Sequence, residues 1–110
     1  MRVEFKQNMR EIDEKAFLIT LIGILTLIEK NVLTIDEAEK FVFSPRVVRE
    51  LSNRNCNKDI ISIVEKGCEL EDIVSLIPET FKEVIEDLKE ETLLCIKKYE
   101  TYDKFDWFEE

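Results

Sequence analysis

The chain has 110 residues, the usual size of one domain, and 45% of them are hydrophobic, which is enough for a core without disulfides or metals. It contains no histidine, the commonest general base near neutral pH, so we expect that it is not an enzyme. Its net charge of −9 disfavours nucleic acid as a partner, because phosphate backbones repel an acidic surface.

Residues 1–110 are expected to form a single, mainly α-helical domain, because only two glycines and two prolines interrupt them. Residues 2–6 alternate polar and apolar side chains, which fits a short N-terminal strand or an arm equally well. Residues 104–108 contain a similar alternation, so they are a candidate pairing partner for such a strand.

The first helix is expected from Asp13 to Lys30, because acidic residues occupy its first turn and a lysine its last, as the helix dipole favours. Apolar residues cover nearly its whole circumference, which predicts a central helix surrounded by the others. Gly23 lies inside this helix, where glycine is unfavourable, so it is expected to mark a close crossing with another helix.

Capping residues predict where the later helices begin. Thr34 opens a capping box, Ser44 and Pro45 are typical of an N-cap and a first helical residue, and Asn57 is a third N-cap. Gly67 is expected in the left-handed conformation that ends a helix. The expected helices after the first are 34–43, 45–53, 58–66, 69–76 and 78–99 or 78–102. These segments predict a compact bundle of five to six helices around the first.

Three cysteines, Cys56, Cys68 and Cys95, are expected to be inert thiols or small buried side chains. Their odd number and the lack of a secretory signal argue against disulfides. A zinc site usually needs four closely spaced ligands, and the acids that follow Gly67 do not match a calcium-binding loop. We therefore expect no metal and no cofactor.

No membrane segment is expected. The longest apolar run, residues 16–28, is shorter than the roughly 20 residues that cross a bilayer. Acidic residues precede it where a secretory signal would be basic, so the protein is expected in the cytoplasm.

Three short motifs point to a family: Phe43-Ser44-Pro45, residues 67–73 (Gly-Cys-Glu-Leu-Glu-Asp-Ile) and residues 75–78 (Ser-Leu-Ile-Pro). On these motifs the chain resembles a family of small bacterial proteins, mainly from Bacillus-like organisms, classed as a domain of unknown function. The likeness spans roughly residues 13–98. It implies a bacterial, cytoplasmic origin and brings no catalytic residues.

Negative charge is concentrated in residues 69–110, which carry 14 acidic and 5 basic groups. Glu86 and Glu90 belong either to a solvated helix face or to a docking surface. The candidate partner-binding aromatic residues beyond them are Tyr102, Phe105, Trp107 and Phe108. These aromatic residues either fold back on the bundle or dock on a basic partner.

The favoured function is therefore a small acidic protein-interaction module, comparable to an immunity protein or an antitoxin, with a protein partner or self-association. The alternative is a helix-turn-helix-like, DNA-binding regulator that uses residues 34–66. Arg46 and Arg49 lie three residues apart on one helix and are the candidate nucleic-acid-binding residues. Pairing of these arginines with the acidic C-terminal half, within one molecule or between two, is favoured over DNA binding.

Overall fold

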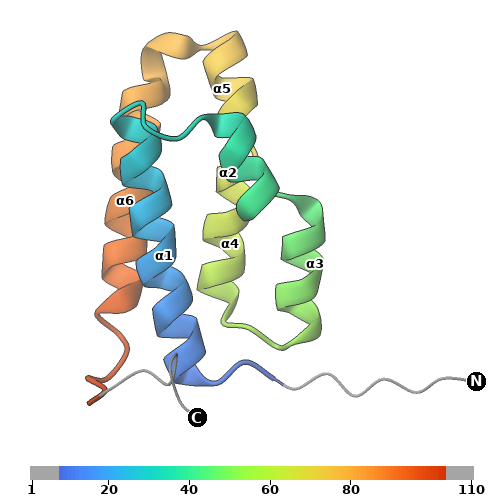
Figure 1. Cartoon of the computed structure of the whole chain (residues 1–110), viewed down its shortest axis with the longest axis vertical. Coiled ribbons are helices and arrows are strands. Elements are labelled where there is room, and N and C mark those ends of the chain that lie inside the picture. Colours follow the sequence, from blue (N-terminus) through green and yellow to red (C-terminus); the bar gives the residue numbers. More distant parts are fainter. Residues whose placement is uncertain (1–7, 104–110) are drawn as a thin grey trace, which may run out of the picture.

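The computed structural model of the protein describes residues 8–103. The strand or arm expected at residues 2–6 and the aromatic residues Phe105, Trp107 and Phe108 therefore lie outside the described residues. The elements in chain order are α1 (Glu11–Glu29), α2 (Ile35–Phe41), α3 (Pro45–Asn53), α4 (Lys58–Gly67), α5 (Leu70–Leu76), the 3₁₀ turn η1 (Pro78–Thr80) and α6 (Phe81–Ile96) (Figure 1). Within the described residues there is no strand, and the prediction of an all-α fold is confirmed.

Within residues 8–103, four longer helices build the bundle, rather than the five to six that were expected. The helices α1, α3, α4 and α6 have nine or more residues, whereas α2 and α5 have seven each. The two short helices connect the longer ones, because the chain turns again at Ser44-Pro45 and at Pro78 before either helix can span the bundle.

The predicted N-terminal caps of α2 and α3 are present in the structure. In the capping box, the backbone N–H of Glu37 donates to Thr34 Oγ1 at 3.0 Å, and Thr34 N–H donates to Glu37 Oε1 at 3.2 Å. The Ser44 hydroxyl accepts from the N–H of Val47 at 3.3 Å, so α3 begins at Pro45 as expected.

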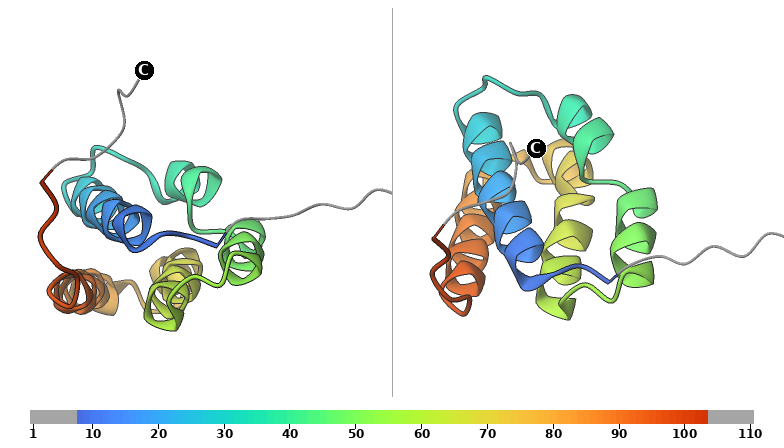
Figure 2. Two further views of the ribbon diagram at one scale, coloured as in Figure 1. Left: turned by 90° about the horizontal axis from the view of Figure 1, so that it is seen from below. Right: turned by 60° about the horizontal axis from the view of Figure 1, so that its bottom comes forward.

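The helix α1 packs alongside α6, and α4 packs against α6 and α3 (Figures 1 and 2). The expectation of a central α1 is wrong, because α1 forms one side of the bundle and buries only one face. Its buried face presents Leu18, Leu21 and Leu25, whereas Ile19 and Leu27 are exposed. Apolar side chains all around a helix therefore did not require neighbours on every side.

Neither glycine has the role that was expected of it. A Cβ built on Gly23 would meet no atom within 4 Å, so no helix crosses there. A Cβ on Gly67 would collide with the buried ring of Phe43, so the close approach occurs at this position. No described glycine has a positive φ, and the left-handed residues are Asn31 (φ 60°) and Asn55 (φ 54°), which follow the C-caps of α1 and α3.

The helix α6 ends at Ile96, three residues before the nearer of the two expected ends. The chain then turns so that Tyr99 reaches back to the start of α1. Within residues 8–103, no helix combines the length and the apolar character that a membrane crossing needs.

Candidate functional site

An apolar groove with an acidic rim runs between α6 and the column formed by α4 and α5. Three adjacent hollows of about 360, 340 and 230 Å³ make up this groove. The first two share Glu69 and Ile73, and the last two share Glu91. We call it the seam groove, and its main lining residues are Asp59, Ile63, Lys66, Glu69, Asp72, Ile73, Leu76 and Ile77 on one side, and Val84, Asp87, Glu91, Leu94 and Lys98 on the other.

The helix α1 lies along one side of the α4–α6 pair (Figure 2, left), and Lys89 of α6 donates to Glu29 of α1 at 2.9 Å. No residue of α1 lines any of the three hollows of the seam groove. Three apolar side chains of the groove are well exposed: Leu76 at 78%, Leu94 at 51% and Ile77 at 46%. Exposed apolar residues that follow one groove are typical of a surface that another molecule covers.

The charges of the seam groove are mainly negative. Five carboxylates and two lysines line it. Both lysines are engaged across the seam, because Lys66 Nζ donates to Glu91 Oε1 at 2.9 Å and Lys98 Nζ donates to Asp59 Oδ2 at 3.2 Å. Among residues 8–103, the other three carboxylates make no ion pair: Glu69, Asp72 and Asp87.

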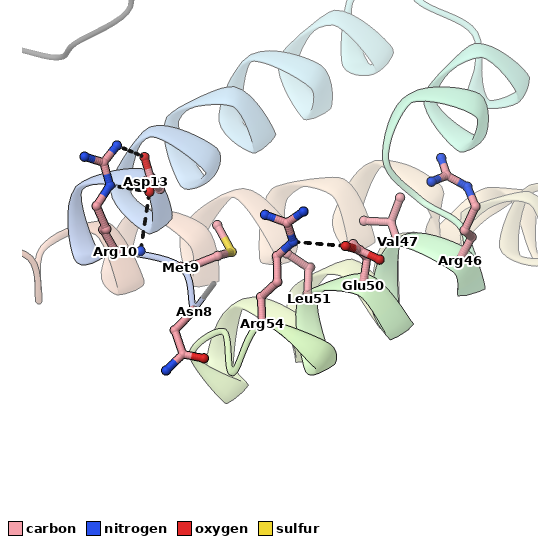
Figure 3. A pocket seen from close by; sticks show the side chains of 9 residues that line it. All are labelled: Asn8, Met9, Arg10, Asp13, Arg46, Val47, Glu50, Leu51 and Arg54. Atoms are coloured by element: carbon pink, nitrogen blue, oxygen red, sulfur yellow. Dashed lines mark hydrogen bonds and ion pairs between the residues drawn. The ribbon is translucent and has the colours of Figure 1, made fainter. Parts of the chain in front are cut away.

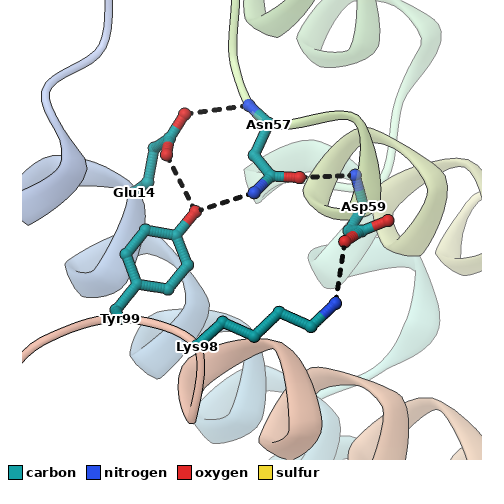
Figure 4. A network of polar contacts seen from close by, with 5 residues as sticks. All are labelled: Glu14, Asn57, Asp59, Lys98 and Tyr99. Carbon is teal, nitrogen blue, oxygen red and sulfur yellow. Dashed lines mark hydrogen bonds and ion pairs between the residues drawn. The ribbon is translucent and has the colours of Figure 1, made fainter.

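A polar network adjoins the groove at Asp59 and Lys98 and joins the helices that form it (Figure 4). Glu14 of α1 is only 7% exposed and accepts from the hydroxyl of Tyr99 and from the backbone N–H of Asn57, both at 2.8 Å. The Asn57 side chain donates to the Tyr99 hydroxyl at 3.3 Å, and its Oδ1 accepts from the N–H of Asp59 at 2.8 Å. The network thus joins the starts of α1 and α4 to the end of α6.

Burial sets the ionisation of the groups near this network. Burial, with a smaller contribution from the Glu14 carboxylate, raises the pKa of Tyr99. The same two causes raise the pKa of Cys56 to about 12, and burial also raises the pKa of Cys68 and of Cys95. All three thiols are free and protonated at neutral pH, which is consistent with the inert thiols expected from the sequence. No group of acids and cysteines within residues 8–103 is arranged to hold a metal ion.

A second groove, of about 310 Å³, lies between the start of α1 and α3 (Figure 3). We call it the arginine groove. Its rim carries Arg10, Arg46 and Arg54, its two acids are Asp13 and Glu50, and its apolar floor consists of Met9, Val47 and Leu51. Two ion pairs lie within it, Arg10 Nε to Asp13 Oδ2 at 2.8 Å and Arg54 Nε to Glu50 Oε1 at 3.0 Å. Of the two arginines singled out by the sequence, only Arg46 lines this groove, and Arg49 is exposed outside it.

The other predicted partner-binding residues lie apart from the seam groove. Glu86 is beside Glu29, and the hydrogen bond between the two carboxyl groups raises the pKa of Glu86. Glu90 is exposed and lines none of the three hollows. Tyr102 is half-buried, with Lys15 Nζ 5.7 Å from its ring centre.

The acids that do line the groove on α6 are Asp87 and Glu91, one position after Glu86 and Glu90. The sequence signal for them was the spacing of Val84, Asp87, Glu91 and Leu94, which repeats every three or four residues. That spacing defines a helix face but does not reveal which neighbouring helix borders it.

The comparisons with curated proteins and with solved structures both returned no match. The family model described as "Protein of unknown function (DUF3969)" matches residues 8–109. The chain therefore belongs to this family of unknown function, in agreement with the resemblance seen in its motifs.

Proposed function

We propose that this protein is a non-enzymatic, cytoplasmic binding module that holds a basic amphipathic helix of a partner protein in the seam groove. In this role it would neutralise or carry its partner, as an immunity protein or an antitoxin does. The observation that carries the proposal is the exposed apolar line of Leu76, Ile77 and Leu94 inside an acidic rim.

The shape of the groove favours a helix as the occupant. On this side the lining residues run from Val84 of α6 to Lys98, two residues past the end of α6, which corresponds to about 21 Å at the rise of a helix. A partner helix of about four turns matches this length. Such a helix would lie against α4 and α6, and with α1 it would complete a four-helix arrangement in which apolar faces meet in the middle.

The charges favour a basic partner. Both lysines of the groove are already paired with carboxylates, whereas Glu69, Asp72 and Asp87 remain available to lysines or arginines of the partner. The net charge of −9 adds long-range attraction for a basic protein, which speeds association more than it increases affinity.

Binding of designed peptides tests this proposal without knowledge of the partner. The probe is a labelled peptide of about four turns, with leucines on one helix face and lysines on the other. We expect it to bind, and we expect a scrambled peptide of the same composition, with no apolar face, to bind far more weakly. Equal binding of both peptides would show mere charge attraction and would overturn the proposal.

Two neighbouring leucines of α6 provide matched variants. Leu94 lines the groove and is 51% exposed, whereas Leu93 is 43% exposed and lies outside it. We expect Leu94→Arg to abolish binding of the amphipathic peptide and Leu93→Arg to leave it nearly unchanged. The wild type and both variants then serve as baits for the natural partner. We expect the wild type and Leu93→Arg to capture it, and Leu94→Arg to fail.

The DNA-binding regulator based on residues 34–66 has less support. Arg46 is exposed, but Arg54 and Arg10 beside it are paired with Glu50 and Asp13, so the basic surface is partly neutralised. Salt-dependent binding of duplex DNA that Arg46→Glu abolishes would favour this alternative.

A further inference from the structure

The corner at which α2 meets α3 has a character opposite to that of the seam groove. We call it the basic corner. It consists of Phe41, Pro45, Arg46 and Arg49, and all four side chains are exposed. The helix α3, which carries most of it, lies across the bundle from α6 (Figures 1 and 2). The proposed function does not use this corner.

Phe41, the last residue of α2, gives the basic corner an apolar tip. Its side chain is 68% exposed, and it is the sole aromatic residue among the large apolar side chains that are exposed within residues 8–103. It lines neither the seam groove nor the arginine groove. Aromatic and arginine side chains are enriched at the centres of protein interfaces, so the composition of the corner is typical of such a surface.

The helix α3 supplies positive charge to the corner. It is the sole helix within residues 8–103 with more basic than acidic residues, because Arg46 and Arg49 outnumber Glu50. Neither arginine makes an ion pair with another residue of the described chain. The seam groove holds the complementary set, namely its three carboxylates that also make no ion pair there.

The end of the seam groove that α5 forms fits the tip of the corner. Glu69, Asp72, Ile73, Leu76 and Ile77 line this hollow of about 360 Å³, which exceeds the volume of a phenylalanine side chain. Leu76 is 78% exposed, the highest value among the large apolar side chains of residues 8–103. Apolar walls bury an aromatic ring favourably, and carboxylates pair with arginine in a two-pronged geometry.

We propose that the basic corner of one copy of this chain docks in the seam groove of a second copy. Phe41 inserts into the hollow at α5, and the two arginines of the corner face Glu69 and Asp72. The corner and the groove are different surfaces of one bundle, so the contact is heterologous, and each copy offers one of each.

The inference rests on the proposed function, because both use the seam groove, and it adds a means of regulation to that site. A groove that a second copy fills is closed to the basic helix of the partner. The two occupants therefore compete, and the partner must displace the corner before it binds. Dilution also opens the groove, because self-association depends on protein concentration.

Analytical ultracentrifugation over a range of concentrations measures the self-association. We expect the wild type to show a mass above that of one chain, which falls on dilution. Phe41→Asp and Leu76→Arg should each raise the dissociation constant by roughly tenfold or more, as the loss of an interface anchor does. Val32→Asp is the matched control for Phe41→Asp, because Val32 is 69% exposed and lies outside both surfaces. It should keep the wild-type constant, and circular dichroism establishes that all variants keep their helix content.

A mixture of the two defective variants provides the sharpest test. Phe41→Asp retains an intact groove, and Leu76→Arg retains an intact corner. Each variant alone should be monomeric at a concentration at which an equimolar mixture forms a dimer of one copy of each. Association should stop at two, because neither free surface of that dimer is intact. A symmetric contact between two corners, or between two grooves, would not be restored by mixing.

Three results would overturn the inference: a wild type that is monomeric at every concentration, an equal effect of Val32→Asp and Phe41→Asp, and a mixture that stays monomeric. Binding of the amphipathic peptide to Phe41→Asp is measured separately, because this variant keeps the groove. Peptide binding without self-association of the wild type leaves the proposed function standing and overturns this inference alone. Self-association without peptide binding overturns the proposed function alone.

Discussion

Tyr99 donates a hydrogen bond of 2.8 Å to Glu14, a buried carboxylate that lies 85 residues earlier in the chain. The other oxygen of the same carboxylate accepts from the backbone of Asn57. One side chain of α1 thus holds both the start of α4 and the end of α6. These two helices form the walls of the seam groove, so the hydrogen bond maintains the site without belonging to it.

Replacement of Tyr99 by phenylalanine removes this donor and leaves one oxygen of Glu14 without its partner. We expect Tyr99→Phe to lower the free energy of unfolding by about 1.5–3 kcal/mol, the usual range for a hydrogen bond to a charged group. Urea denaturation measures the change. Glu14→Gln and the double variant complete a thermodynamic cycle, and additive effects in that cycle would contradict a direct coupling of the two side chains.

The raised pKa of Tyr99 predicts a loss of stability at alkaline pH. Above the ordinary tyrosine value of 10.0, the unfolded chain releases this proton while the folded protein still retains it. The unfolded state then binds fewer protons, so stability falls as pH rises. Denaturation midpoints measured from neutral to alkaline pH should decrease, and Tyr99→Phe should flatten this decrease. An unchanged slope in the variant would mean that other groups cause it.

The two glycines provide a matched pair of substitutions. Gly67→Ala should destabilise the protein by about 1–3 kcal/mol, because the added methyl group collides with the buried Phe43 ring. Gly23→Ala should stabilise it by up to about 1 kcal/mol, since the position is helical, exposed and open. Thermal or urea unfolding distinguishes these outcomes. Equal changes in stability at both positions would show that helix propensity alone determines the effect of the substitution.

Helix starts could be predicted from the sequence because capping is a local interaction. Thr34, Ser44 and Asn57 each accept a hydrogen bond from a backbone N–H two or three residues later, and no other part of the fold is needed for this. The roles of Gly23 and Gly67 could not be predicted in this way. They depend on which segment passes near each glycine, and Phe43 lies far from Gly67 in the sequence.

The candidate site was predicted only in its general character. The acidic C-terminal half was visible in the sequence, and so was the spacing of three or four residues that places Val84, Asp87, Glu91 and Leu94 on one face of α6. The acids of α6 that line the groove, however, are Asp87 and Glu91 rather than the predicted Glu86 and Glu90, because α4 borders that face of α6. Which face a neighbouring helix borders is a tertiary property, and a helical repeat does not determine it.

Glu39 of α2 provides a second prediction about pH. Its partial burial and the nearby carboxylate of Glu71 on α5 raise its pKa above 4.5, so the folded protein binds this proton more tightly than the unfolded chain does. The unfolded state binds fewer protons as pH rises through this range, and stability therefore falls. Glu39→Gln should raise the melting temperature at neutral pH and have little effect in acid, where the carboxyl group is protonated in both states. If Glu39→Gln raised the melting temperature equally at neutral and at acidic pH, the raised pKa of Glu39 could not be the cause.

Substitutions at Asp87 and Glu90 distinguish two sources of attraction for a basic helix: the rim of the seam groove and the overall negative charge of α6. Both are exposed, and each substitution to the neutral amide removes one charge, but only Asp87 lines the groove. We expect Asp87→Asn to weaken binding of the basic amphipathic peptide severalfold and Glu90→Gln to have much less effect. The difference should shrink at high salt, because ions screen exposed charges. If both variants weaken binding equally, the peptide senses only the net charge, and the seam groove is not its binding site.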